Sequence, residues 1–216
     1  MNAREEILAR LRTATRDIST SPGSGGERTV VTTPAESAAR TLELFVRTVA
    51  DYRARVERCS PGDVAASVAA ALVRGGAHRV VIPDGLEAAW VAPLRDSGIR
   101  LVPDRGEDGQ PLTAAELDEM DAVVTAARLA IATTGTIVLD HDADQGRRAL
   151  TLVPDQHVCV VRADLVVHDV PDAVRLLDPL RPLTWISGPS ATSDIELDRV
   201  EGVHGPRTLD VIVVES

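Results

Sequence analysis

The chain has 216 residues, 44% of them hydrophobic, which suits one folded domain or one domain with an appendage. Its formal net charge is −10 and all 23 basic residues are arginine, so no positive nucleic-acid-binding surface is visible, and a Schiff-base lysine and a lysine-dependent Walker A site are excluded. It has neither an apolar run long enough to span a membrane nor the apolar core of a signal peptide, and we therefore expect a cytoplasmic protein.

The first 34 residues differ in pattern from the rest of the chain. Residues 2–16 predict a short amphipathic helix, and residues 19–26 have the Gly- and Ser-rich composition of a flexible linker. We therefore expect an N-terminal helical appendage over residues 1–34 and one domain over residues 35–216. A helix this short is not stable alone, so it is a candidate docking arm.

Helices and strands alternate through the domain. Capping patterns at 33–36, 60–63 and 113–116 each predict the start of a helix. Further helical segments are predicted at 86–96, 127–134 and 171–177. The predicted strands are 78–83, 99–102, 122–125, 136–139, 158–161, 165–167, 183–186 and 209–214.

The strands of the middle third are continuously apolar and alternate with helices. This pattern indicates a mainly parallel sheet that is covered on both faces. The final third has more strands, so we expect antiparallel pairs there. The sequence therefore predicts an α/β fold.

Metal and cluster ligands are sparse. Cys59 and Cys159 are far apart and form no metal-spaced pair, and no iron–sulfur cysteine run exists. Residues 140–144 (Asp-His-Asp-Ala-Asp) begin like a calcium loop, but Gly146 comes one position late and Thr151 stands where the bidentate glutamate belongs. We therefore expect no metal site and no cofactor on this chain.

The stretch from 187 to 207 is dense in glycine, proline, hydroxyl and carboxylate residues, and it lies between two predicted strands. It reads SGPSATSDIE, then LDRVE, then GVHGPR. Loops at strand ends are where α/β proteins present ligand-binding groups. We therefore expect the site to include this stretch.

Several segments of the sequence resemble one known family. GPSATSDIE followed by GVHGPRTL, together with ATTGT at 132–136 and LVPDQHV at 152–158, resembles the lactate-utilisation protein C family, also called the LUD domain family. The resemblance covers most of residues 35–216. It implies a three-layer α/β/α Rossmann-like sandwich similar to the fold of CoA transferases and ribose-5-phosphate isomerase.

Two groups of residues could bind an anion. Thr134, Gly135 and Thr136 could point successive N–H groups and hydroxyls at a carboxylate or phosphate, or could form a plain tight turn. Arg147 and Arg148 are candidate anion clamps, or are simply solvated. In folds that the resemblance implies, a loop like the first group binds the acidic end of a substrate.

The carboxylates of the 187–207 stretch are the candidate catalytic groups. In an extended segment Asp194 and Glu196 point the same way, so they could share a proton or bind a cation. Gly188, Ser190 and Thr192 precede them as candidate ligand contacts. The alternative is that these polar side chains satisfy the backbone of an irregular loop.

Three further residues complete the predicted site. His204 could act as a general base or bind an acid anion, with Gly205 allowing close approach and Arg207 alongside. Alternatively, His204 hydrogen-bonds the opposite loop. His157, in contrast, opens a strand and is predicted to be structural.

The resemblance implies an accessory or substrate-binding subunit of an iron–sulfur complex that oxidises L-lactate to pyruvate. The clusters would lie on partner subunits, and this chain would bind a small carboxylate. The alternative is a free-standing enzyme of the CoA-transferase or isomerase type, acting on a small acid anion or phosphate ester. A third hypothesis is an assembly factor without a pocket. The oligomeric state is open, with a homo-oligomer among the options.

Overall fold

The computed structural model describes Glu6, Arg10 and residues 35–105, 109–190 and 205–215. The chain divides into two units, Met1–Pro34 and Ala35–Ser216. In the first unit Glu6 and Arg10 are helical and form an i,i+4 ion pair. The rest of the expected helix, the linker and the start of the first capping pattern lie outside the described residues. No helix in the described part of the chain is long and apolar enough to cross a membrane.

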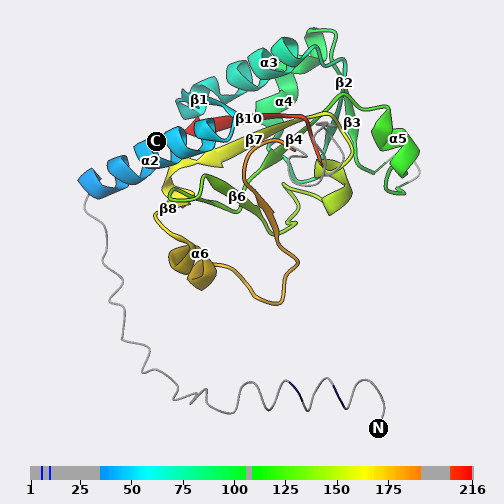
Figure 1. The fold of residues 1–216 in the computed structure, drawn as a ribbon. Helices are drawn as coiled ribbons and strands as arrows, with labels where there is room; N and C mark the ends of the chain where they lie inside the picture. Colours follow the sequence, from blue (N-terminus) through cyan, green and yellow to red (C-terminus); the bar gives the residue numbers. More distant parts are fainter. Residues whose placement is uncertain (1–5, 7–9, 11–34, 106–108, 191–204, 216) are drawn as a thin grey trace, which may run out of the picture. The chain divides into compact units, whose positions relative to one another are not determined.

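A six-stranded, wholly parallel sheet forms the centre of the second unit (Figure 1). In spatial order its strands are β1 (Arg55–Cys59), β10 (Thr208–Val214), β7 (Gln156–Arg162), β4 (Ala122–Ala126), β2 (Arg79–Ile82) and β3 (Arg100–Pro103). The predicted parallel sheet is therefore confirmed. The edge strand β1 was not predicted, because its charged residues interrupt the apolar pattern.

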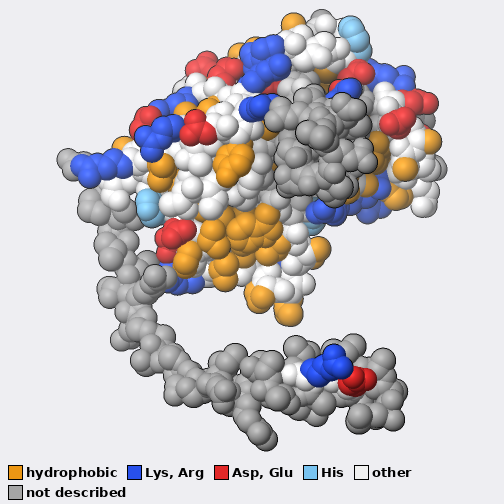
Figure 2. All heavy atoms as spheres, viewed as in Figure 1, with side chains coloured by type: hydrophobic (Ala, Val, Ile, Leu, Met, Phe, Trp, Pro, Cys, Tyr) orange, Lys and Arg blue, Asp and Glu red, His pale blue; other side chains and the backbone are white. Residues whose placement is uncertain are grey.

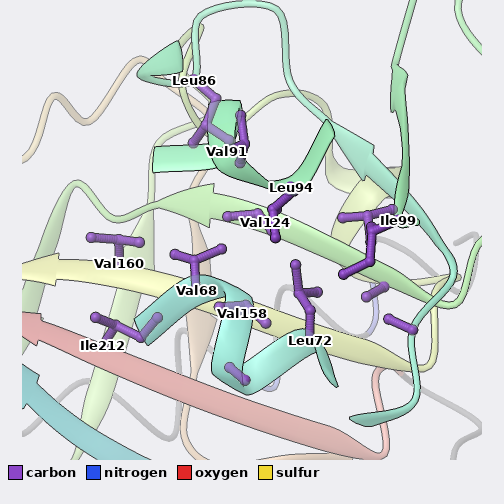
Figure 3. Close-up of a cluster of buried hydrophobic side chains, with 14 of the residues drawn as sticks. Val68, Leu72, Leu86, Val91, Leu94, Ile99, Val124, Val158, Val160 and Ile212 are labelled. Atoms are coloured by element: carbon purple, nitrogen blue, oxygen red, sulfur yellow. The ribbon is translucent and has the colours of Figure 1, made fainter. Parts of the chain in front are cut away.

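Both faces of this sheet are buried. Successive residues of each strand point to opposite sides, so alternate residues of one strand belong to different cores. On one face Val158 and Val160 of β7 join a core with α3 (Val64–Gly75), α4 (Ala88–Val91) and the 3-10 helix η2 (Ala92–Asp96), shown in Figure 3. On the other face Cys159 and Val161 join a second core with α2 (Ala35–Asp51). The result is the predicted three-layer α/β/α arrangement.

Helices and a small second sheet cover this other face. Helix α2 (Ala35–Asp51) lies over β1, and α5 (Ala114–Asp118) packs near β2 and β4 through Leu117, Val81 and Val123. The capping box at Thr113 is present, with the Glu116 N–H donating to the Thr113 hydroxyl and the Glu116 carboxylate accepting from the Thr113 backbone. The cap predicted at Ser60 starts a 3-10 turn instead, without a side-chain cap hydrogen bond.

The second sheet has four short strands, β8 (Val166–Val167), β5 (Leu129–Ile131), β6 (Thr136–Leu139) and β9 (Thr184–Ile186), in that order. β5 pairs antiparallel with β6, and β6 antiparallel with β9. The helical turn predicted at 127–134 is therefore wrong: this segment holds strand β5 and a hairpin turn. Pairing with two neighbours outweighs the helix propensity of its alanines.

Helix α6 (Val170–Leu176) packs on the outer side of the small sheet through Ala173 (Figure 1). Exposed hydrophobic residues accompany it: Val174 and Leu176 on the helix, Leu180 after it and Trp185 on β9. Figure 2 shows hydrophobic side chains gathered over this part of the domain. The small sheet is thus covered only in part on its outer face.

Candidate functional site

A pocket of about 170 Å³ lies at the amino ends of β7 and β10, between the main sheet and β9. His157 and Leu209, the second residues of their strands, form its floor. Residues 184–190 and 205–206 form much of the wall. Parallel α/β sheets usually bind ligands at the carboxyl ends of their strands, so this pocket lies at the less common edge. A second cavity of about 230 Å³, lined by Trp90 and Arg162 among others, lies at the carboxyl ends.

Arg148 is the cationic residue of the first pocket. It begins the 3-10 helix η3 (Arg148–Thr151), and its Nη1 donates to the Thr184 hydroxyl at 2.8 Å. Among the described residues it has no carboxylate partner. Its neighbour Arg147 is different, since it donates to both oxygens of Asp104 at 2.8–3.1 Å. Of the two predicted anion clamps, therefore, the structure holds Arg147 on a carboxylate of the protein and leaves Arg148 in the pocket.

The His157 ring is buried at the floor of this pocket. Its Nε2 is 2.8 Å from the hydroxyl of Thr125, a fully buried residue of β4. Burial lowers the pKa of His157 from 6.5 to about 4, because the imidazolium would lose its hydration. The ring is therefore neutral near pH 7. Burial and the bond to Thr125 agree with the structural use predicted from the sequence, and His157 also lines the pocket.

Hydroxyl groups connect the pocket wall to the predicted Thr-Gly-Thr turn. The Ser187 hydroxyl, which lines the pocket, is 2.8 Å from the hydroxyl of Thr136, and Thr136 is 2.7 Å from that of Thr134. Thr134, Gly135 and Thr136 do not themselves line the pocket. The turn therefore supports the wall through Ser187, and direct anion binding by its N–H groups stays a prediction.

Two glycines allow these loops to approach helix α2 and the turn that follows it closely. Gly135 has φ +57°, and a Cβ there would lie 2.9 Å from the carbonyl carbon of Thr48. Gly188 lines the pocket with φ +82°, and a Cβ there would lie 2.7 Å from the carbonyl oxygen of Tyr52. Only glycine combines positive φ with such close contact to backbone.

The predicted 187–207 stretch reaches the pocket from both ends. Ser190 and Gly205 line it, and the Ser190 N–H donates to the Pro206 carbonyl at 2.8 Å. Four predicted site residues lie outside the described residues: Thr192, Asp194, Glu196 and His204. Arg207 does not line the pocket; it donates to Asp155 at 2.5 and 2.6 Å.

Neither cysteine is placed or tuned for chemistry. Burial raises the pKa of the Cys159 thiol to about 12 and also raises that of Cys59, so both favour the unreactive thiol form. In the 140–144 loop, Asp140 is buried near Arg128 and Arg181 at 3.6 Å. The described residues contain no group of three side chains able to hold a metal ion.

Thr184 and His141 are among the residues at or beside the pocket that were not predicted from the sequence. Thr184 looked like one residue of an apolar strand, and it reaches the pocket only because β9 pairs with β6. His141 was treated only as part of a failed calcium loop, yet its ring contacts Thr184. No sequence signal marked either residue, since both depend on strand pairing.

Comparisons with known proteins agree with one another. A family model described as the LUD domain matches residues 42–214. Lactate utilization protein C of Deinococcus radiodurans is 50% identical over 182 residues, which cover 82% of this chain and 81% of that protein. Lactate utilization protein C 1 of Bacillus mycoides is 32% identical over 121 residues, 52% of this chain and 49% of that protein. The crystal structure of a DUF162 family protein from Deinococcus radiodurans has a TM-score of 0.69 at 43% identity, covering 82% of this chain and 98% of that one.

Proposed function

Because this chain belongs to the LUD domain family, we propose that it serves lactate utilisation as the component that binds the small carboxylate. The names of its relatives support a part in lactate utilisation, and the pocket around Arg148 supports the binding of a small carboxylate. In this proposal the chain is an accessory or substrate-binding subunit of a complex that oxidises L-lactate to pyruvate. Oxidation releases two electrons and two protons, and iron–sulfur clusters on partner subunits accept the electrons.

The observation that carries the proposal is an arginine without a carboxylate partner among the described residues, in a pocket of about 170 Å³. An apolar cavity of about 150 Å³ holds benzene, which has as many non-hydrogen atoms as lactate, so the size is suitable. A guanidinium binds a carboxylate through charge-assisted hydrogen bonds. Leu152, Trp185 and Ile186 offer apolar surface for the methyl group.

The cysteine content supports clusters on partners rather than on this chain. Iron–sulfur clusters are held mostly by four cysteine thiolates. The chain has two cysteines, and the Cys159 side chain is fully buried in β7. The chain would therefore bind and orient lactate while another subunit takes the electrons.

The proton acceptor in this proposal is Glu196 or Asp194, with His204 as a further candidate. The support is the position of Ser190 and Gly205, which flank these residues in the sequence and line the pocket. If a carboxylate there removes a proton without any redox partner, the chain is instead a free-standing enzyme of the CoA-transferase or isomerase type. Turnover of L-lactate, or of an acyl-CoA or phosphate ester, by the purified chain alone distinguishes the two functions.

Calorimetric titration with L-lactate and with pyruvate tests the binding role. We expect the wild-type chain to bind at least one of them, and Arg148→Gln to bind about 10–150-fold more weakly, as expected when charge-assisted hydrogen bonds are lost. The control is Arg175→Gln, which removes an arginine of α6 that is paired with Asp172. Absence of binding by the wild type, or equal weakening in both variants, would reject the proposal.

A further inference from the structure

A chain of three hydrogen bonds lies behind Arg148. Arg148 Nη1 is 2.8 Å from the Thr184 hydroxyl, and that hydroxyl is 2.9 Å from His141 Nε2. The other ring nitrogen, His141 Nδ1, is 3.0 Å from the Gly146 carbonyl oxygen. Thr184 is buried, and both it and Arg148 line the pocket.

The chemistry of the two end groups fixes the direction of two of the bonds. A carbonyl oxygen only accepts, so His141 Nδ1 carries a proton and donates it to Gly146. A guanidinium only donates, so the Thr184 oxygen accepts from Arg148. Between Thr184 and His141, the hydroxyl donates to a neutral ring and accepts from a protonated one. All three bonds are satisfied in either case.

The backbone at His141 is held in an unusual conformation. Its φ is +58°, in the left-handed region that residues other than glycine adopt infrequently. The following turn is closed by the N–H groups of Gln145 and Gly146, which donate to the Asp142 carbonyl at 2.9 and 2.8 Å. Strained backbone persists where the surroundings enforce it, and functional sites are a common place for it.

We propose that His141 is a positioning residue that, through Thr184, holds the Arg148 guanidinium ready for a bound carboxylate. The inference rests on the proposed function, because it concerns the same pocket. Without the hydrogen bond to Thr184, the exposed Arg148 side chain would sample many rotamers and would lose conformational entropy when the ligand binds. The hydrogen-bonded relay from His141 through Thr184 to Arg148 removes part of this entropy loss before the ligand binds. It also favours one orientation of a small monocarboxylate.

Four variants test the relay by calorimetry with L-lactate or pyruvate, whichever the wild type binds. His141→Gly removes the ring, while glycine adopts φ +58° without strain. Thr184→Val removes the hydroxyl at nearly constant shape, and Thr184→Ser keeps it. We expect the first two to weaken binding about tenfold and Thr184→Ser to stay within about twofold of the wild type. In an Arg148→Gln background, His141→Gly should have no further effect.

Nitrogen NMR of the His141 ring provides a second readout, independent of ligand. The relay requires a proton on His141 Nδ1, and a ring protonated at Nε2 alone would overturn it. A wild type that binds while His141→Gly and Thr184→Val bind equally well also overturns the relay and leaves the proposed function standing. A wild type that binds neither acid overturns the proposed function, and the positioning role with it.

Discussion

Single polar residues in this domain take their roles from what packs around them. Arg147 and Arg148 are adjacent, yet the first is held by Asp104 and the second lies in the pocket. The sequence identifies such an arginine pair but cannot separate the two, because their partners come from distant strands and loops. The same holds for His157, which is buried and bonded to Thr125, as its predicted structural role implies, and which also lines the pocket.

The buried His157 makes stability depend on pH. Burial lowers its pKa from 6.5 to about 4, so between these values the unfolded chain binds a proton that the folded chain does not. Its contribution is complete above pH 6.5 and is lost as the pH falls toward 4, a total of about 3 kcal/mol.

We therefore expect the free energy of unfolding, measured in urea, to fall by about 2 kcal/mol more between pH 7 and pH 5 in the wild type than in His157→Gln. Because the substitution itself changes stability at neutral pH, the comparison concerns the slope of the free energy of unfolding with pH. Equal slopes in the two proteins would show that His157 is not buried as a neutral ring.

At the scale of elements, the β5–β6 hairpin turn is docked on helix α2. Gly135 has positive φ and lies against the backbone of Thr48, whereas Gly76, the C-cap of α3, has φ +72° with open space around it. The two glycines thus share a conformation and differ in contacts. They form a matched pair for measuring the contribution of docking.

We expect Gly76→Ala to lower the free energy of unfolding by about 1 kcal/mol, the strain of a left-handed alanine. Gly135→Ala should lower it by about 2–4 kcal/mol, because the added methyl group also displaces α2. Chemical denaturation of both variants measures the difference. Similar losses of unfolding free energy in both variants would mean that the hairpin turn moves away from α2 without destabilising the domain.

The elements that the sequence predicted well are those with a strong local pattern. Val158–Val161 is continuously apolar and forms the middle of β7. The predictions of β5 and β1 failed for opposite reasons: β5 lies in the alanine-rich segment 127–134, and β1 carries Arg55, Glu57 and Arg58 at an edge. Both are strands because of their neighbours in space, which local periodicity does not report. The pocket depends on such pairings and was predicted only along the 187–207 stretch and at Arg148.

At the scale of the whole molecule, the hydrophobic clusters of the second unit all lie between residues 42 and 214. We therefore expect a fragment of residues 35–216 to fold by itself. Circular dichroism should show a cooperative thermal transition for the fragment, with the full chain measured beside it. A broad, non-cooperative transition in the fragment alone would show that residues 1–34 are needed for folding.

The position of β1 in the main sheet has a consequence for synthesis on the ribosome. β1 is an edge strand whose neighbour is β10, with Arg55 opposite Asp210. At about 5–20 residues per second, translation needs on the order of ten seconds or more between these two strands. Throughout that interval the nascent chain exposes β1 without its partner strand. Chaperone demand during synthesis should therefore end only when the last strand emerges.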